Sequence, residues 1–137
     1  MTFLLDANVI LERALMRSAH ADVTELFALA TGNQLCVSRF SLHAIAWYMT
    51  PRNRDGFRRL VMDLSLAGVA VADLSLDELI PVVDAMDRHA LDFDDAFNFT
   101  VAEKFGLTIV SLDSDYDRTP RGRLTPAQVV AQLRSTP

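Results

Sequence analysis

Residues 107–113 read Leu-Thr-Ile-Val-Ser-Leu-Asp, a short apolar run that ends in a carboxylate. A run that is apolar at almost every position, rather than at alternate positions, is typical of a strand buried on both faces, as in a parallel sheet. Residues 3–6, Phe-Leu-Leu-Asp, repeat this arrangement near the start of the chain. The two segments predict two buried strands, each followed closely by an aspartate.

Two further apolar runs, Leu35–Val37 and Val69–Ala72, predict strands between those two. The segments around the strands carry apolar residues at helical spacing. They predict helices over residues 7–16, 21–30, 41–49, 55–67, 96–105 and from 126 onward, with one more ending near residue 90. Gly32-Asn33 predicts a turn, Ser38 is placed to cap the helix after it, and Thr125-Pro126 begins the last helix.

The sequence does not decide where the helix that ends near residue 90 begins. Ser75 and Glu78 match a capping box, but Pro81 follows six residues after the cap, so this helix either kinks or begins closer to Pro81. Strands separated by helices, with no hairpin signal between them, need right-handed crossovers. The sequence therefore predicts an α/β fold, a three-layer α/β/α sandwich with a mostly parallel sheet of four to five strands.

The 137 residues show no shift in composition, which predicts one domain over residues 1–137. Hydrophobic residues make up 50% and charged residues 23%, far from the composition of disordered proteins. The longest charge-free run, residues 26–38, is too short and too polar for a membrane helix. No secretion signal precedes Phe3, and the single Cys36 makes no internal disulfide, so we expect a cytoplasmic protein.

The net charge of −5 argues against an unselective electrostatic grip on nucleic acid. The charges are unevenly distributed along the chain. Between residues 92 and 117, seven acids face the single base Lys104, whereas residues 52–59 hold four arginines and one aspartate. An acidic cluster beside arginine-rich segments indicates a cation site next to an anionic ligand.

Three carboxylates are expected to meet at one edge of the sheet. Asp6 and Asp113 follow buried strands, and Asp95 stands at the start of the helix that leads into the second of them. Ligands of open α/β sheets bind beyond the carboxyl ends of the strands. Converging carboxylates repel each other unless a cation compensates, and Mg²⁺ or Mn²⁺ takes oxygen ligands of this kind. The pattern predicts phosphoryl-group chemistry at a divalent-metal site.

Helix capping or loop solvation explains each of these acids taken alone. Caps have no reason to lie at the ends of neighbouring buried strands, so the joint placement favours metal binding by Asp6, Asp95 and Asp113. For Asp115 and Asp117, the sequence does not decide between a place in the metal site and exposure to solvent. The sequence contains no competing nucleophile elbow, Walker A loop, dinucleotide-binding glycine motif or zinc-ligand spacing.

Three blocks of the sequence together resemble the signatures of the PIN domain family, whose most abundant small prokaryotic members are the VapC-type ribonucleases. The blocks are Leu4-Leu5-Asp6-Ala7-Asn8-Val9-Ile10, Asp95-Ala96 with Ala102 seven residues on, and Ile109-Val110-Ser111-Leu112-Asp113-Ser114-Asp115-Tyr116. They occur in the order and spacing of the family. The resemblance covers nearly the whole chain, from Phe3 to about Arg118.

The resemblance implies a parallel α/β/α sandwich and a Mg²⁺- or Mn²⁺-dependent endoribonuclease. It also implies a homodimer and, in many members, an antitoxin partner encoded alongside. By matching blocks, the site residues of the family fall on catalytic and metal-binding Asp6, Asp95 and Asp113 and on the supporting Asn8 and Ser111. Asp115 is a further candidate ligand.

One position departs from the family pattern. A glutamate is usual six residues beyond a serine such as Ser38, and this sequence has Ala44 there, with no acid anywhere in residues 34–53. His43 is a poor Mg²⁺ ligand and points about 100° away from Ala44 on a helix, and Glu12 is a second weak candidate. The missing acid predicts weak metal binding and low activity.

The leading hypothesis is a PIN-type ribonuclease that hydrolyses RNA phosphodiesters. The alternative is a catalytically weakened PIN-fold module that binds RNA or a protein partner. A receiver-like domain fits worst, because it needs paired acids near the first strand and a lysine at a later strand end, whereas Lys104 lies inside a predicted helix.

Arginines are candidates for RNA binding, because the planar guanidinium matches phosphate oxygens. The candidates are Arg52, Arg54, Arg58 and Arg59, and, after the acidic block, Arg118, Arg121 and Arg123. The solvated face of an amphipathic helix explains the first group equally well. Trp47 and Tyr48 are expected to pack in the core or in an interface.

Overall fold

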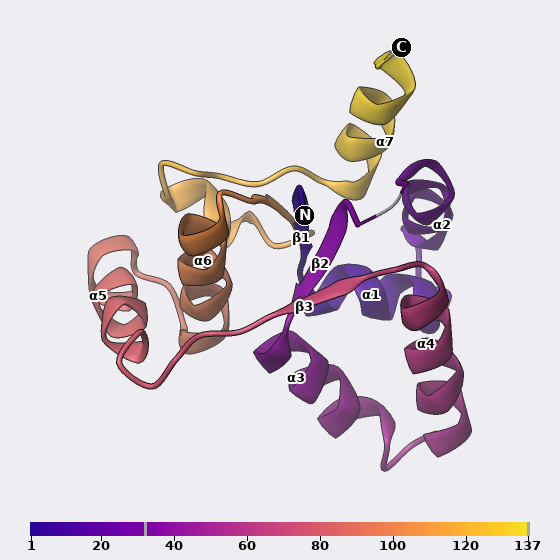
Figure 1. The fold of residues 1–137 in the computed structure, drawn as a ribbon, viewed down its shortest axis with the longest axis horizontal. Helices are drawn as coiled ribbons and strands as arrows, with labels where there is room; N and C mark the ends of the chain where they lie inside the picture. The colour runs from indigo at the N-terminus through magenta and orange to yellow at the C-terminus, as the bar shows by residue number, and fades with distance from the viewer. Residues whose placement is uncertain (32, 137) are drawn as a thin grey trace.

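Four parallel strands form the middle layer of the protein. They are β1 (Phe3–Leu5), β2 (Leu35–Ser38), β3 (Ala70–Ala72) and β4 (Thr108–Val110). The strands lie in the order β3-β2-β1-β4, of which Figure 1 labels β1, β2 and β3, and an isolated bridge between Val110 and Leu124 continues the sheet beyond β4. The computed structural model describes residues 1–31 and 33–136, so Gly32 of the predicted turn lies outside the described residues.

Helices cover both faces of this sheet. In the described residues they are α1 (Ala7–Ala14), α2 (His20–Leu29), α3 (Arg39–Met49), α4 (Arg54–Leu66), α5 (Leu79–His89), α6 (Phe93–Phe105) and α7 (Pro126–Ser135), with a 3-10 helix, η1, at Ser114–Arg118. Helices α5 and α6 lie on one side of the sheet, and α1, α2, α4 and α7 on the other (Figure 1). The predicted three-layer sandwich is confirmed. No helix among the described residues has the length and apolar character that crossing a membrane requires.

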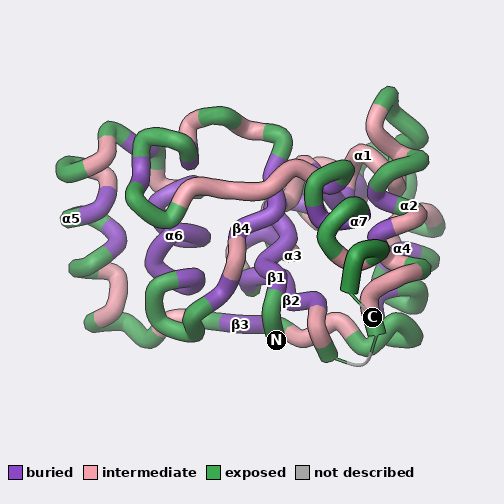
Figure 2. The backbone as a smooth tube through the Cα atoms, turned by 90° about the horizontal axis from the view of Figure 1, so that it is seen from above, coloured by how far each residue is buried: buried purple, intermediate pink, exposed green. Residues whose placement is uncertain are grey.

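The core is divided by the sheet, because successive strand residues point to opposite faces. Phe3 and Leu5 pack with α1, α2, α4 and α7, whereas Leu4 and Ile109 pack with α5 and α6. Figure 2 shows the buried strands at the centre, between the two helical layers. Cys36 is a buried free thiol and packs as a small apolar side chain, as predicted.

Short polar side chains turn the strand ends directly into helices. Asp6 Oδ1 accepts a 2.7 Å hydrogen bond from the Ala7 N–H at the start of α1, and Ser38 Oγ accepts one of 3.1 Å from the Ser41 N–H at the start of α3. Thr125 forms the predicted cap of α7. Helices α1 and α3 therefore both begin at the carboxyl edge of the sheet.

Several helix boundaries differ from the predicted ones, by one to three residues. Helix α6 begins at Phe93, three residues early, because Asp92 caps it by accepting a 3.0 Å hydrogen bond from the Asp95 N–H. Asp95 therefore lies in the first turn of the helix and not ahead of it. Helix α1 ends at Ala14, earlier than predicted, and Met16 beyond it adopts a left-handed φ of 51°.

Helix α5 begins close to Pro81, one of the two predicted alternatives. Pro81 lies in its first turn, where the missing N–H leaves no gap in the helical hydrogen bonds. The Ser75 N–H donates a 2.8 Å hydrogen bond to Glu78 Oε1. The predicted capping box is therefore a turn that ends just before the helix begins.

Candidate metal centre

Asp6 and Asp113 emerge at the same edge of the sheet. Strands β1 and β4 are parallel neighbours with Leu5 paired to Val110, so the residues after both strands leave the sheet together. The Asp6 N–H donates a 2.9 Å hydrogen bond to the Val110 carbonyl, which extends this pairing to the aspartate itself. The carboxyl edge of the sheet thus carries two carboxylates from opposite ends of the chain.

Three carboxylates come within reach of one cation at this edge. Carboxylate oxygens of Asp95, Asp113 and Asp115 lie within 4.8 Å of one another. Asp113 caps η1 by accepting a 2.9 Å hydrogen bond from the Asp115 N–H, which turns the chain back over the site. The structure thus brings Asp115 into the acidic group, although the sequence left it open between the site and solvent. We call these three residues the acidic group.

One oxygen of the acidic group has no partner. Asp95 is 5% exposed, and its Oδ2 is buried without a hydrogen-bond partner among the described residues. Burial of a charged oxygen without compensation is costly. An all-oxygen donor set is the set that Mg²⁺ and Mn²⁺ prefer, and a cation held there would supply the missing partner. The residues present therefore fit a divalent ion.

Asp6 lies beside the acidic group and is already hydrogen-bonded at both oxygens. Its Oδ1 accepts from the Ala7 N–H at 2.7 Å and from Asn98 Nδ2 at 3.3 Å, and its Oδ2 accepts from Ser111 Oγ at 2.7 Å. All of these partners are donors, and none of them carries a charge. The charged form of Asp6 is therefore held in one orientation by neutral groups.

Burial and mutual repulsion disfavour the charged forms of two carboxylates. Burial raises the pKa of Asp95 to about 7, and the neighbouring carboxylates of Asp92, Asp6 and Asp113 add to this effect. Burial is also the main cause that raises the pKa of Asp6, with a smaller contribution from Asp113. A cluster of carboxylates with raised pKa values stores repulsion that a bound cation would relieve.

Ser111 and Asn8 connect the strand ends. Besides its bond to Asp6, Ser111 Oγ accepts from the Asp113 N–H at 2.9 Å and from Asn8 Nδ2 at 3.3 Å. Asn8 Oδ1 in turn accepts from the Leu112 N–H at 3.3 Å. These contacts fix the segment after β4 against the start of α1.

Two polar residues of the site were not singled out from the sequence as site residues. Asn98 of α6 is 2% exposed and contacts Asp6, and Tyr116 of η1 is fully buried beside both. Asn98 lies three residues after Asp95, so the two share a helix face. A polar residue on this otherwise apolar face is the signal that could have identified it.

Among the described residues, neither Glu12 nor His43 takes the place of an acid at Ala44. Ala44 is half-buried on α3, one turn beyond Ser41, whose hydroxyl contacts Asn98. Glu12 instead accepts a hydrogen bond from the Ala19 N–H at 2.9 Å and braces the turn between α1 and α2. His43 is exposed and faces an apolar hollow between α3 and α4. Neither belongs to the acidic group.

The arginines after the acidic group divide between two edges of the sheet. Arg118 Nη2 pairs with Asp115 Oδ1 at 2.9 Å, beside the acidic group. Arg123 Nη1 donates to the Ser111 carbonyl at 3.0 Å, at the same edge. Arg121 Nη1 donates to the Leu107 carbonyl at 2.8 Å, just before β4 begins. Arg121 therefore lies at the amino-terminal edge, away from the carboxylates.

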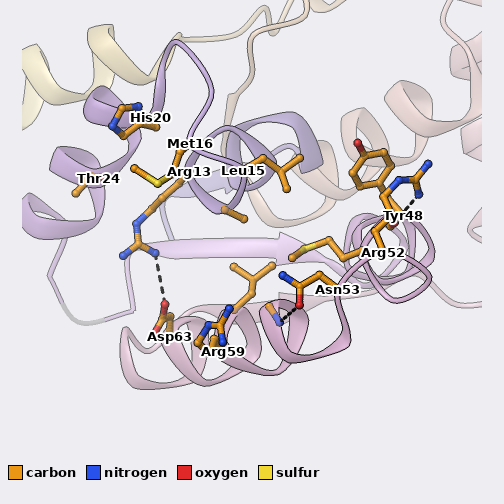
Figure 3. A pocket seen from close by; sticks show the side chains of 14 residues that line it. Arg13, Leu15, Met16, His20, Thr24, Tyr48, Arg52, Asn53, Arg59 and Asp63 are labelled. Carbon is orange, nitrogen blue, oxygen red and sulfur yellow. Dashed lines mark hydrogen bonds and ion pairs between the residues drawn. The ribbon is translucent and has the colours of Figure 1, made fainter.

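Arg52 lines a separate hollow of about 420 Å³ (Figure 3). Arg13 and Arg59 point into the same hollow, and Arg52 stacks on the Tyr48 ring with 4.1 Å between the guanidinium carbon and the ring centroid. The hollow lies at the carboxyl-terminal ends of α1 and α3, whereas the acidic group lies near their starts. An 11-residue helix such as α3 is about 16 Å long, so Arg52 is remote from the acidic group.

Arg54 lies on the surface nearby and lines a shallower depression with Arg52 and Arg58. Arg58 pairs with Asp55 at 2.5 Å within α4. These arginines therefore form a solvated helical surface, at a distance from the carboxylates.

Comparison with protein families matches residues 3–122 to the PIN domain. A comparison with curated protein sequences gives no match. The family match includes both strand-end aspartates and the start of α6, and it ends before α7.

Comparison with solved structures gives similar folds in toxin–antitoxin systems. A toxin–antitoxin complex from Klebsiella pneumoniae has a chain with a TM-score of 0.72 and 16% identity, covering 91% of this chain and 98% of that one. VapC20 of Mycobacterium tuberculosis, a toxin that cleaves the sarcin-ricin loop, has a TM-score of 0.69 and 18% identity. The match covers 85% of this chain and 93% of VapC20. VapBC2 from Rickettsia felis, bound to a DNA fragment of its promoter, has a TM-score of 0.64 and 15% identity, covering 90% and 97%.

Proposed function

Because the chain belongs to the PIN domain family, we propose that it is a metal-dependent endoribonuclease of the VapC type and the toxin of a toxin–antitoxin pair. In this proposal residues 1–137 form one PIN domain that acts in the cytoplasm on RNA phosphodiesters. The toxins among the similar structures support the proposal, because their chains share nearly the whole fold.

The observation that carries the proposal is the acidic group with its unpartnered oxygen. Asp95 Oδ2 is buried without a hydrogen-bond partner among the described residues, and a carboxylate oxygen of Asp95 lies within 4.8 Å of oxygens of Asp113 and Asp115. A structural cap does not need three converging carboxylates, and a stable core does not retain a lone buried carboxylate oxygen. A site for a divalent cation explains both features.

Each residue of the site has a distinct task in this proposal. Asp95 and Asp113 hold Mg²⁺ or Mn²⁺ together with Asp6, and Asp115 is a further ligand. Asn8 and Ser111 keep the carboxylates in place. The ion, when bound, polarises a phosphoryl oxygen and helps to activate water. The low exposure of Asp6 and Asp95 limits the access of bulk water to this part of the site.

Arg118 is the arginine best placed for substrate. Its Nη2 pairs with Asp115 at 2.9 Å and its Nη1 donates to the Ala90 carbonyl at 2.6 Å, so a phosphate at the metal site would take the remaining N–H donors of the guanidinium. Arg52 and Arg54 lie about one helix length away and would contact a more distant part of the RNA. Arg121 lies at the opposite edge and is no longer part of this proposal.

Ala44 favours a second candidate function. The helix face that carries Ser41 and Ala44 offers a hydroxyl and a methyl group to the site, but no carboxylate. A site with one acid fewer binds cations more weakly. The second candidate is therefore a PIN-fold module that binds RNA or a protein partner and cleaves slowly.

An antitoxin is the protein partner in this proposal. The hollow in Figure 3 holds Arg52, Arg59 and Arg13, of which Arg13 pairs with Asp63 at 3.9 Å. Met49 and Leu60 also line it. Two arginines without an ion pair among the described residues, beside an apolar lining, complement an acidic amphipathic segment. We place the antitoxin contact there.

A second copy of the chain is the other partner. Trp47 is 83% exposed, so its predicted place in the core is wrong and an interface remains. On α3 it lies one turn beyond His43, which lines an apolar hollow of about 320 Å³ together with Leu42, Phe57 and Val71. A large apolar side chain and an apolar hollow on one face form a self-complementary surface, as a two-fold dimer requires. The outer edge of β3 beside them is also unpaired in the described residues.

Cleavage of defined RNA by the purified chain tests the proposed function. We expect internal cleavage with Mn²⁺, slower cleavage with Mg²⁺ and none with excess EDTA, and we expect Asp95→Asn to abolish it. Asp84→Asn, an exposed carboxylate on α5, is the matched control and should cleave normally. RNA binding without cleavage under any metal would favour the second candidate, and cleavage that persists in EDTA would exclude the metal site.

A further inference from the structure

Asn98 is the centre of a buried hydrogen-bond network next to the acidic group. Its Nδ2 lies 3.3 Å from Asp6 Oδ1, from Ser41 Oγ and from Tyr116 Oη. Its Oδ1 accepts from Ser38 Oγ at 2.7 Å and from Ser41 Oγ at 3.3 Å. One carboxamide thus connects β1, the start of α3 and η1.

Donor and acceptor counts fix how this carboxamide is oriented. Both serine hydroxyls donate to Oδ1, which fills its two lone pairs, and the two Nδ2 hydrogens go to Asp6 and Tyr116. The opposite orientation would place a carbonyl oxygen against the Asp6 carboxylate, where the two would repel. Every polar atom of Asn98 is therefore satisfied in one arrangement only.

The network leaves the Tyr116 hydroxyl hydrogen free to face the carboxylates. Because Tyr116 Oη accepts from Asn98, its own hydrogen is available as a donor. This single hydrogen can be donated to one of the two carboxylates, and the nearby hydroxyl partly offsets the rise in pKa that burial causes at Asp6 and at Asp95. Asn98 thus donates one hydrogen bond to Asp6 itself, and its contact with Tyr116 sets the direction in which the Tyr116 hydroxyl can donate a second one.

The network is neutral throughout. Asn98, Ser38, Ser41 and Tyr116 orient the carboxylates without bringing a cation that would compete with a metal ion, or an anion that would add to the repulsion. Ser41 also lies one turn from Ala44, on the α3 face where an acid is missing. The neutral network occupies the side of the site that such an acid would approach.

We propose that Asn98 is a positioning residue that holds the Asp6 carboxylate and the Tyr116 hydroxyl in the geometry that metal binding requires, an inference that rests on the proposed function. Asn98 is too deeply buried to touch substrate and acts through Asp6. Loss of a residue that orients a metal-binding side chain typically lowers metal affinity by about 10–100-fold.

The test compares Asn98→Leu with Thr100→Val on the full chain. Leucine has the same branched arrangement of side-chain heavy atoms as asparagine but removes every hydrogen bond that the Asn98 side chain makes. Thr100 is a matched control, because it is buried on the same helix and its hydroxyl bonds only to the Ala96 carbonyl of its own helix. Mn²⁺ affinity is measured by calorimetric titration of the protein without RNA, and folding by circular dichroism and thermal unfolding.

We expect Asn98→Leu to bind Mn²⁺ about 10–100-fold more weakly than wild type, and Thr100→Val to bind within about twofold of it. A folded Asn98→Leu protein with wild-type affinity would overturn the proposal. If Asn98→Leu does not fold, the Mn²⁺ affinity of Ser41→Ala is the test instead. This variant removes the hydroxyl that contacts the Asn98 carboxamide and leaves Asp6 unchanged. Unchanged affinity in a folded Ser41→Ala protein would then overturn it.

The outcome is separable from that of the proposed function. Wild-type protein that binds Mn²⁺ but does not cleave RNA would contradict the nuclease, while a loss of affinity in Asn98→Leu would still support the positioning role. Wild-type protein that cleaves RNA, with Asn98→Leu equal to it in Mn²⁺ affinity, would contradict only the positioning role.

Discussion

Ser111 Oγ donates a 2.7 Å hydrogen bond to Asp6 Oδ2 and so joins two residues 105 positions apart in the chain. The same oxygen accepts from the Asp113 N–H at 2.9 Å. One fully buried hydroxyl thus sets the separation between the two strand-end carboxylates. The distance between the carboxylates depends on the pairing of β1 with β4, which holds Ser111 beside Asp6.

Ser111→Ala removes this connection. The Asp113 N–H and Asp6 Oδ2 each lose a partner in a buried site, so we expect the free energy of unfolding to fall by about 1–3 kcal/mol. Mn²⁺ affinity should fall with it, because Asp6 is less well oriented. Chemical denaturation measures the first effect, with Ser65→Ala on the exposed surface of α4 as the control. Equal stability of both variants would show that Ser111 is not needed to hold the site.

Asp113→Asn should abolish Mn²⁺-dependent RNA cleavage while the protein stays folded. Removing one of several like charges relieves repulsion, so without metal its Tm should equal or exceed the wild-type value by a few degrees. Gel assays of cleavage and thermal unfolding in EDTA measure the two effects. Asp117→Asn, in the 3-10 helix that Asp113 caps but outside the acidic group, is the control. Normal cleavage by Asp113→Asn would exclude it as a ligand.

The stability of the metal-free protein should depend on pH through Asp95. Its pKa rises from 3.8 to about 7 on folding, so between these values the folded state binds more protons than the unfolded state. The contribution of Asp95 is fully present below the lower value and is lost as the pH rises through the upper one. In EDTA, Tm should therefore be higher near pH 5 than near pH 8.

Asp95→Asn provides the matched comparison for this pH dependence. Without the titrating carboxyl, the difference in Tm between the two pH values should shrink, and added Mn²⁺ should shrink it in wild type as well. Differential scanning calorimetry in both conditions measures this. A wild-type profile that rises toward pH 8, or one that Asp95→Asn leaves unchanged, would contradict the role of Asp95.

Ala44→Glu should tighten Mn²⁺ binding and raise cleavage. The position shares a helix face with Ser41, so a longer acidic side chain there approaches the site. Ala131→Glu is the control, because it is the same substitution at an exposed position of α7. Rapid wild-type cleavage in Mg²⁺ with no gain from Ala44→Glu would mean that Asp115 or another group already fills the gap.

Trp47→Asp should separate the proposed dimer into monomers. A charge at the centre of an apolar contact cannot be solvated there, and loss of an exposed side chain leaves the core intact. Sedimentation velocity measures the mass, and thermal unfolding checks the fold. Leu66→Asp is the control, because Leu66 is also an exposed apolar residue but lies on α4. A wild-type protein that is monomeric at all concentrations would exclude this interface.

Capping shows why sequence patterns locate elements better than their ends. Asp92, Asp94 and Asp95 are all suitable caps, and the sequence alone placed the helix start after the last of them. In the structure Asp92 is the cap. Which of several adjacent caps is used depends on the packing of the helix against its neighbours, and local preference does not decide it.

The sequence by itself determined the α/β/α sandwich and the aspartates at the strand ends, because both depend on short-range patterns: apolar runs, helical spacing and the residue that follows each strand. Only the tertiary structure decided that Asp115 joins the acidic group, that Asn98 reaches Asp6 and that Arg121 lies at the opposite edge. These contacts depend on which strands become neighbours and how the helices pack across the sheet. Contacts between residues distant in the chain follow from that packing and leave no periodic signal in the sequence.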